Sequence, residues 1–200
     1  MTTVALVDAG GANFASVRHA LERLGAVVRQ ARDADEMRSA SHVVLPGVGA
    51  SGPAMELLHE RGLDAALRAS ELPLLGICLG MQLLYQGSAE GGDSLLGLLP
   101  GRVERLQPAP GIRVPHMGWN ALLDVRPDPL LDGIDAGECM YFVHGYAAAP
   151  DQDDVARCEH GQRFAAVVRR GTTCGVQFHP ERSGAAGARV LGNFLQMAAA

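Results

Sequence analysis

The chain has 200 residues, of which 48% are hydrophobic and 20% charged, and its formal net charge is −5. That length suits a single domain over residues 1–200 with a sizeable core, and the negative charge argues against nucleic-acid binding. None of the 17 basic residues is lysine, which excludes Schiff-base chemistry and the lysine of a phosphate-binding P-loop.

Strands and helices alternate through the first half of the chain. Predicted strands cover residues 4–7, 26–29, 42–45 and 72–77. Predicted helices lie between them, over residues 14–24, near residue 35 and over residues 54–70. This alternation predicts a three-layer α/β fold, in which an open, mostly parallel sheet carries helices on both faces. In such a fold the site lies beyond the carboxyl ends of the strands, where Asp8, Pro46 and Cys78 fall.

The second half of the chain has shorter apolar segments between Pro- and Gly-rich turns. Residues 103–106, 141–143 and 164–168 are predicted to be antiparallel additions to the same sheet, and a final helix is predicted over residues 185–197. The acidic stretches 124–135 and 151–154 are predicted to be solvated turns.

The four cysteines lie far apart, with no C-x-x-C pair and no histidine at zinc-finger spacing. Structural zinc and a disulfide scaffold are therefore not expected, and a reducing cytoplasm fits. The first apolar run reaches Asp8 after four residues, so no signal peptide is expected, and no run approaches the ~20 residues that span a bilayer. We expect a cytoplasmic protein with no cofactor, no metal, and no membrane or nucleic-acid partner.

Residues 76–82, of sequence GICLGMQ, place Cys78 where the apolar strand should turn into a helix. Glycine stands two residues before Cys78 and two after it, which is the nucleophile-elbow pattern with sulfur in place of oxygen. The N–H groups of the following helix favour a thiolate and leave donors for an oxyanion. The alternative is a cysteine that serves as a small core residue, but the paired glycines favour a nucleophile.

Residues 175–181, of sequence GVQFHPE, contain the base that such a nucleophile needs. His179 comes where a strand should end, and its pKa near neutrality lets it take a proton from a thiol and return it to a leaving amine. Glu181 is placed to orient the imidazole through its second nitrogen. The sequence thus predicts a Cys78–His179–Glu181 triad, whose chain order differs from serine hydrolases that share the elbow.

Residues 46–52, of sequence PGVGASG, contain a G-x-G-x-x-G pattern directly after a predicted strand. A dinucleotide site would need an acidic residue at the end of the next strand, but that strand ends at Cys78. A better role for Gly47, Val48 and Gly49 is a second oxyanion donor beside the elbow. The two glycines would let the peptide at Val48 rotate, so this donor is predicted to be switchable.

The remaining histidines and cysteines carry weaker signals. His116 and His144 lack the spacing of metal ligands, so they are predicted to be hydrogen-bonded structural residues rather than ligands that join His179 at a metal. The three other cysteines are predicted to be buried packing residues, Cys139, Cys158 and Cys174. Trp119 fits either the core or an interface.

Taken together, these motifs resemble the class I, triad-type glutamine amidotransferases, whose signatures are G-x-C-x-G-x-Q and x-Q-x-H-P-E. More narrowly, the sequence is similar to the glutaminase subunits of imidazole glycerol phosphate synthase, which serve histidine biosynthesis. The narrower match rests on residues 46–49, 97–101, 114–120 and 141–146, which occur in the family's order. Residues 114–120, of sequence VPHMGWN, are the most discriminating, because sister amidotransferases share the elbow and not this string.

This resemblance implies a glutaminase mechanism. Cys78 attacks the side-chain amide of glutamine, and the oxyanion is held by backbone N–H groups of Leu79 and of the 47–49 loop. His179 protonates the departing ammonia, and water then hydrolyses the glutamyl thioester. The resemblance also assigns glutamine binding to Gln82 and to the backbone of Val143, His144, Gly145 and Tyr146.

The resemblance further implies a partner that uses the ammonia. That partner is a (β/α)₈-barrel cyclase in a heterodimer, and the products of the complex are imidazole glycerol phosphate and aminoimidazole carboxamide ribotide. Partner and nucleotide binding are expected to gate the loop around Val48. Two alternatives stay open: an amidotransferase for pyridoxal phosphate or anthranilate synthesis, which residues 114–120 disfavour, and a silent regulatory subunit, which the intact triad disfavours. A thioesterase is disfavoured by the order of the triad.

Three departures from the family pattern concern the periphery of the site. Residues 8–13 read DAGGAN where the family has D-Y-G-x-G-N, and this segment is expected near the partner surface. Gly145 replaces a serine, which is tolerable if its contact is made through the backbone. Arg182 replaces the commoner lysine after the triad glutamate, with the same charge and a different geometry.

Overall fold

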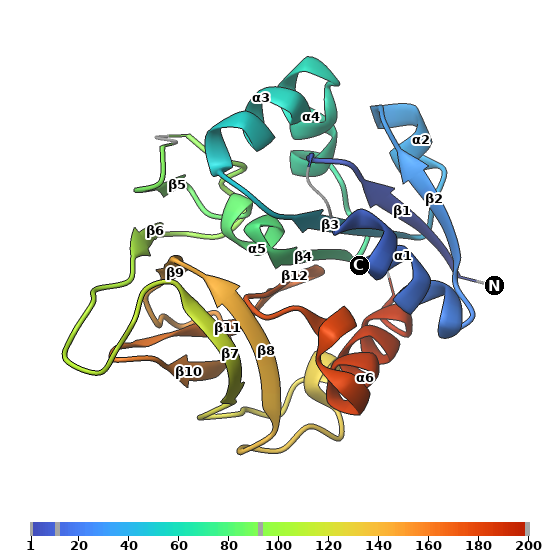
Figure 1. Ribbon diagram of the computed structural model, residues 1–200. Helices are drawn as coiled ribbons and strands as arrows, with labels where there is room; N and C mark the ends of the chain where they lie inside the picture. The colour runs from blue at the N-terminus through green and yellow to red at the C-terminus, as the bar shows by residue number, and fades with distance from the viewer. Residues whose placement is uncertain (1, 11–12, 92–93, 199–200) are drawn as a thin grey trace.

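Within residues 2–10, 13–91 and 94–198, which the computed structural model describes, a seven-stranded sheet runs through the middle of the molecule (Figure 1). Its strand order is β10-β11-β12-β4-β3-β1-β2. The parallel part comprises β12 (Thr173–Val176), β4 (Leu74–Cys78), β3 (His42–Gly47), β1 (Thr3–Val7) and β2 (Val27–Ala31). The antiparallel part comprises β11 (Arg163–Arg170) and β10 (Asp154–Glu159). The predicted α/β fold with a mostly parallel sheet is confirmed.

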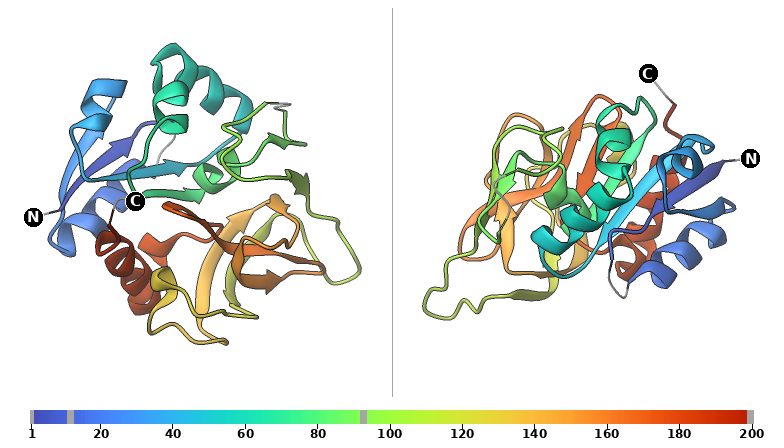
Figure 2. Two further views of the ribbon diagram at one scale, coloured as in Figure 1. Left: turned by 180° about the vertical axis from the view of Figure 1, so that it is seen from behind. Right: turned by 90° about the horizontal axis from the view of Figure 1, so that it is seen from above.

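Helices cover both faces of this sheet (Figure 2). On one face lie α1 (Phe14–Arg23) and α6 (Gly184–Leu195). On the other lie α2 (Ala34–Arg38), α3 (Ser51–Glu60), α4 (Leu63–Arg68) and α5 (Leu79–Leu83). The helical stretch predicted over residues 54–70 is thus two helices, because Gly62 adopts a left-handed conformation, with φ 65°, between them.

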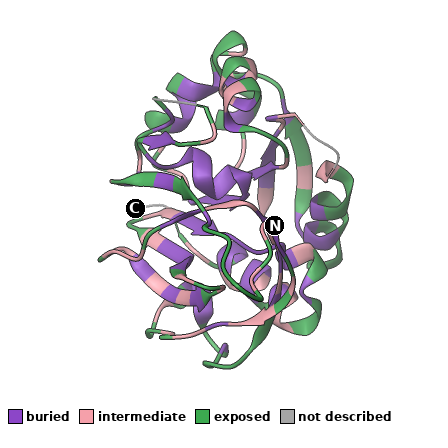
Figure 3. Ribbon diagram, turned by 60° about the vertical axis from the view of Figure 1, so that its left-hand side comes forward, coloured by how far each residue is buried: buried purple, intermediate pink, exposed green. Residues whose placement is uncertain are grey.

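The alternation of side chains along β1 shows why the core has two parts. Val4 and Leu6 pack against α1 and α6, whereas Ala5 and Val7 pack toward the helices on the other face. A strand buried on both faces must be apolar at successive positions, which is the pattern seen in residues 4–7. Buried residues accordingly run through the centre of the molecule and exposed ones lie on the outer sides of the helices (Figure 3).

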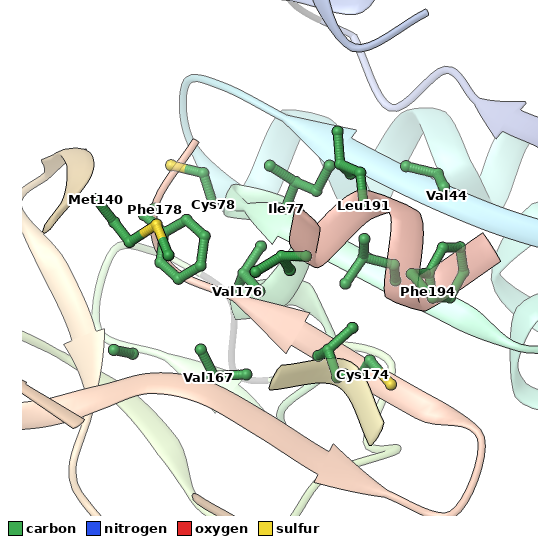
Figure 4. Packing of buried hydrophobic residues seen from close by; sticks show 14 of the residues in the cluster. Val44, Ile77, Cys78, Met140, Val167, Cys174, Val176, Phe178, Leu191 and Phe194 are labelled. Atoms are coloured by element: carbon green, nitrogen blue, oxygen red, sulfur yellow. The ribbon is translucent and has the colours of Figure 1, made fainter. Parts of the chain in front are cut away.

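The second half of the chain departs from its prediction in one respect. Residues 164–168 lie in β11 of the main sheet, as predicted, but residues 103–106 and 141–143 do not extend that sheet. A small separate sheet contains β5 (Gly87–Ser88), β6 (Arg102–Arg105) and β9 (Tyr146–Ala148). A separate ribbon is formed by β7 (His116–Ala121) and β8 (Cys139–His144). The ribbon stacks on the face of the main sheet, because the inward side chains of β8, Met140 and Phe142, join the core beneath it. Figure 4 shows Met140 beside Phe178 in this core.

The two acidic stretches are not simply solvated turns. Pro129–Leu131 forms a 3₁₀ helix with Leu130 and Leu131 buried. The side chain of Asp128 is almost fully buried, and its Oδ2 forms an ion pair with Nε of Arg169 at 2.6 Å. Asp154, only 1% exposed, is held by Arg157 at 2.9 Å. The prediction is wrong for these carboxylates because arginines of β10 and β11 pair with one oxygen of each inside the fold.

Two of the three other cysteines are buried and one is exposed. Cys158 and Cys174 are buried, as predicted, and burial raises the pKa of each thiol to about 12. Cys139 is exposed, contrary to the prediction, because it begins β8 on the side that faces away from the core. No helix in the described ranges is both long enough and apolar enough to cross a membrane.

Candidate active site

The backbone at Cys78 makes a sharp turn from β4 into α5. Its φ of 55° and ψ of −111° are unusual for a residue with a side chain, and neighbouring backbone must hold the strain. A Cβ at Gly76 would lie 2.6 Å from the carbonyl oxygen of Gly80, and one at Gly80 would overlap the carbonyl oxygen of Leu45. Both flanking glycines are therefore required by close backbone contacts. Cys78 lies at one end of the core cluster beneath α6 (Figure 4).

The 47–49 loop lies beside this elbow because β3 is the neighbour of β4. The register pairs Gly47 directly with Cys78, and a Cβ at Gly47 would lie 3.0 Å from the backbone nitrogen of Gly80. Gly49 has a φ of 99°, a conformation that glycine adopts without strain. The structure therefore brings the predicted oxyanion loop and Leu79, the first residue of α5, to the same side of the cysteine.

His179 reaches the elbow because β12 pairs in parallel with β4 on its other side. The backbone N–H of His179 donates to the carbonyl of Tyr141 at 2.9 Å, and the Ser183 hydroxyl donates to the carbonyl of His179 at 2.7 Å. Nδ1 of His179 lies 3.0 Å from Oε1 of Glu181, whose side chain is fully buried. Since a carboxylate only accepts, Nδ1 carries the hydrogen and Nε2 is left for the thiol.

The charge state of His179 follows from its two partners. Burial by itself lowers the pKa of His179, but its hydrogen bonds to Cys78 and Glu181 and their negative charge outweigh burial and raise the pKa above its ordinary value of 6.5. This direction favours a protonated imidazole at His179. His179 is thus equipped to donate a proton to a leaving group, which is the task of a general acid.

A cavity of about 170 Å³ opens on Cys78 and His179. Its walls contain predicted oxyanion residues, Val48, Gly49 and Leu79, and every predicted glutamine-binding residue, Gln82, Val143, His144, Gly145 and Tyr146. Two predicted residues are absent from the walls: Gly47, which pairs with Cys78 in the sheet, and Glu181, which lies behind the imidazole. The pocket around the thiol is thus built from distant parts of the chain. For example, Sγ of Cys78 contacts the carbonyl oxygen of Val143, 65 residues away in the sequence.

Residues 5–198 match the family model described as glutamine amidotransferase class-I. The chain belongs to the class-I glutamine amidotransferases. It is 58% identical over 197 residues to the imidazole glycerol phosphate synthase subunit HisH of Xanthomonas euvesicatoria pv. vesicatoria (strain 85-10), with 98% of each chain covered. It is 56% identical over 200 residues to the HisH subunit of Xylella fastidiosa (strain Temecula1 / ATCC 700964), with 100% of each covered.

Solved structures share the fold of this amidotransferase chain. A crystal structure of a glutamine amidotransferase matches with a TM-score of 0.76 at 23% identity, covering 96% of this chain and 97% of the other. The structure of PurLQS from Thermotoga maritima matches with a TM-score of 0.72 at 24% identity, covering 98% of each chain. At this level of identity the matches establish the α/β architecture.

Gln82 and Glu90 refine the description of the cavity. Both hydrogens of the Gln82 amide are used within the protein, because its Nε2 donates to the carbonyl of Tyr146 at 2.8 Å and to Oε1 of Gln177 at 3.0 Å. Only its Oε1 is left for a ligand. Glu90, which sequence reasoning missed, adds a carboxylate that accepts from the N–H of Ser51 at 3.3 Å, and burial raises its pKa. Glu90 stands in no recognisable motif.

Asn13 is a second residue that sequence reasoning missed. Its Nδ2 donates to Oε1 of Glu181 and lies 3.2 Å from Nδ1 of His179. Since that nitrogen already donates to the carboxylate, the amide hydrogen goes to Glu181. The prediction placed residues 8–13 near a partner surface; Gly11 and Ala12 lie outside the described residues, but Asn13 belongs to the triad's surroundings.

A second cavity of about 260 Å³ also borders His179. It shares Val48, Val143 and His179 with the first and is further lined by Asn13, Ser16, Tyr141 and Arg182. Next to it the ribbon carries Met117, 65% exposed, which pairs with Val143. Trp119 is 58% exposed, and the centroid of its ring lies 5.9 Å from that of Tyr141 in an edge-to-face arrangement. Trp119 is therefore a surface residue, and exposed large apolar side chains of this kind mark interaction sites.

Proposed function

We propose that the chain is the glutaminase subunit of an imidazole glycerol phosphate synthase, which hydrolyses L-glutamine to glutamate and ammonia for a cyclase subunit. The observation that carries this proposal is a thiol on a strained elbow, which lines a cavity of about 170 Å³ together with His179, whose Nδ1 lies 3.0 Å from Glu181. The identity of 58% to a HisH subunit over 98% of both chains supports the narrower assignment.

The proposed chemistry begins with the thiolate. Sγ of Cys78 adds to the amide carbon of glutamine, and backbone N–H groups of Leu79 and of the 47–49 loop hold the oxyanion. As the intermediate collapses, the carbon–nitrogen bond breaks and His179 gives its proton to the departing ammonia. The neutral imidazole then takes a proton from water, whose oxygen attacks the thioester and releases glutamate and the cysteine.

Glutamine recognition is assigned to the walls of the same cavity. The carboxylate of Glu90 is suited to the α-ammonium group of glutamine, because it is an acceptor in a partly buried position. Backbone groups of residues 143–146 and Oε1 of Gln82 line the remaining walls and would hold the side-chain amide and the carboxylate. Recognition through backbone at residue 145 explains why glycine suffices there.

We assign ammonia transfer to the second cavity and its rim. The partner is a (β/α)₈-barrel cyclase that seats on Met117 and Trp119 of the ribbon and closes the cavity over Asn13 and Arg182. The chain would act as one domain in a cytoplasmic heterodimer, forming imidazole glycerol phosphate and aminoimidazole carboxamide ribotide with that partner. The loop around Val48 lines both cavities and is suited to couple partner binding to oxyanion binding.

The test is glutamate release from glutamine by the chain alone and with a cognate cyclase and its nucleotide substrate, with Cys78→Ala as the blank. We expect strong release only in the complete mixture. Equal release by the isolated chain would contradict gating at the 47–49 loop. No release under either condition, with Cys78 still reactive toward a thiol reagent, would contradict the proposal and favour another amidotransferase pathway or a silent subunit.

A further inference from the structure

A chain of hydrogen bonds crosses the ribbon and ends at the wall of the cavity beside Cys78. Nδ1 of His116 lies 3.0 Å from Nε2 of His144, and Nδ1 of His144 lies 2.8 Å from the carbonyl oxygen of Tyr146. At the other end, Nδ2 of Asn120 lies 3.2 Å from Nε2 of His116 and 2.8 Å from the carbonyl oxygen of Glu159. We call Asn120, His116 and His144 the ribbon relay. The prediction that both histidines are hydrogen-bonded is confirmed.

The direction of every bond in the ribbon relay is determined by its two ends. The carbonyl of Tyr146 only accepts, so Nδ1 of His144 carries a hydrogen and its Nε2 has a lone pair. His116 must therefore donate through Nδ1 and accept at Nε2. Asn120 is oriented independently, since its Nδ2 donates to the carbonyl of Glu159 and its Oδ1 accepts from the next N–H at 2.9 Å. Both ends require the same direction, and each atom meets its complement.

The same bonds require both imidazoles to be neutral. An added proton on either ring would place one N–H against another in these bonds. Burial, as the main cause, lowers the pKa of His116 to about 4 and that of His144 to about 3. The ionisable groups that act on the pair are His160, whose ring centroid lies 4.1 Å from that of His116, and His179.

The ribbon relay continues into the walls of the cavity. The carbonyl of Tyr146, which accepts from His144, also accepts from Nε2 of Gln82 at 2.8 Å. Gln82 in turn donates to Oε1 of Gln177, and Nε2 of Gln177 lies 3.8 Å from Sγ of Cys78. One carbonyl therefore joins the ribbon to the elbow, and its two acceptor positions are filled from opposite sides.

We propose that the ribbon relay positions residues 143–146 for glutamine binding, so that His116 and Asn120 are positioning residues that act through His144. Neither His116 nor Asn120 lines the cavity, whereas each residue from 143 to 146 does. This inference rests on the proposed glutaminase function and deepens it. It gives a role to residues 114–120, the motif that the chemistry at Cys78 does not use.

The test compares two variants of His116 in the complex of the chain with its cyclase. In His116→Asn, the amide Nδ2 replaces the Nδ1 donor toward His144. In His116→Leu, the side chain has nearly the shape of asparagine but no donor. Because one buried acceptor loses its partner, His116→Leu should raise the KM for glutamine about tenfold and change kcat less than about twofold. His116→Asn should restore KM to within about threefold of the wild type. Phe194→Leu, a core change on the buried face of α6, should lower Tm without changing KM.

The outcomes separate this inference from the proposed function. If the wild-type complex releases no glutamate, the proposed function itself fails. If the wild type is active and His116→Leu leaves KM unchanged, or if His116→Asn raises KM equally, the ribbon relay has no positioning role. Should the variants not fold, nitrogen NMR of the wild type decides: both rings must be neutral Nδ1–H tautomers at neutral pH, and an Nε2–H tautomer on either ring overturns the inference.

Discussion

Two parts of the proposed triad are held in different ways: the elbow at Cys78, and the turn after β12 that carries His179 and Glu181, which we call the corner. At the elbow, Cys78 has a strained backbone that is enforced by close contacts of Gly76 and Gly80 with neighbouring backbone. At the corner, His179 has an ordinary extended backbone, with φ of −99° and ψ of 95°. Its place is maintained by hydrogen bonds from Ser183 and to Tyr141.

This difference separates two functions of one site. A nucleophile must stay at a single point beside its oxyanion donors, and steric exclusion achieves that. A proton carrier must instead exchange hydrogen bonds during the reaction, and side-chain partners allow that. Variants of the elbow should therefore affect folding first, whereas variants of the corner should affect rate first.

The largest expected effect is on the elbow. Gly80→Ala places a Cβ against the carbonyl oxygen of Leu45, so the β4–α5 turn must open. We expect a loss of more than about 4 kcal/mol in the free energy of unfolding, or no folded protein. Urea denaturation measures this. Gly192→Ala is the matched control, because a Cβ there meets nothing within 4 Å, and it should be neutral or stabilising. Equal stability of both variants would contradict the steric account.

At the corner, Glu181→Gln should leave the fold intact and remove most of the activity. The amide presents a donor or a neutral acceptor to Nδ1 of His179, so it no longer favours the imidazolium or the productive tautomer. We expect kcat for glutamate release to fall about a thousandfold. Steady-state kinetics with the cyclase complex tests this, with exposed Glu22→Gln as control. A fall of less than about threefold would show that Glu181 does not orient the base.

The ribbon relay should also make the stability of the fold depend on pH. The pKa of His116 and of His144 is 6.5 in the unfolded chain, but in the folded protein it is lowered to about 4 for His116 and about 3 for His144. The unfolded state therefore holds more protons between these values, and stability falls as pH falls through 6.5. We expect a loss of about 1–2 kcal/mol per ring between pH 7 and pH 5.

Urea unfolding at the two pH values measures this loss. His116→Asn should remove part of it, whereas the exposed His19→Asn should not. An equal loss in the wild type and in His116→Asn would contradict the neutral state of His116, and this difference is the decisive quantity because His179, whose pKa is raised, contributes with the opposite sign in both proteins.

The smallest expected effect concerns Asn13. Asn13→Ala removes the amide donor to Glu181, which leaves the buried carboxylate with fewer partners. The α1 helix should persist, because the Asn13 side chain makes no capping bond to it. We expect kcat to fall about fivefold with little change in KM. If kcat is unchanged while KM rises, Asn13 acts on substrate access instead of on the triad.

Much of the main sheet was predictable from local pattern. Strands such as residues 4–7 are buried on both faces and read as apolar runs, and the alternation with helices determines parallel order. The β7–β8 ribbon was not predictable in its place. Its half-buried alternation fits an edge strand of the sheet as well as a separate layer, and only the packing of Phe142 decides between them.

The sequence by itself predicted the elbow and the proposed triad of Cys78, His179 and Glu181, which the structure brings together. The reason is that a strand, two glycines and a cysteine within seven residues form a recognisable elbow pattern, and the close contact of Gly76 with Gly80 lies within it. The contact that requires Gly80 itself is with Leu45 of β3. Only the tertiary structure decided that Asn13 meets Glu181 across a separation of 168 residues, that Glu90 enters the cavity, and that both hydrogens of the Gln82 amide are engaged. These contacts depend on how distant strands bring their ends together, and hydrogen-bond partners of this kind leave no periodic trace in a sequence.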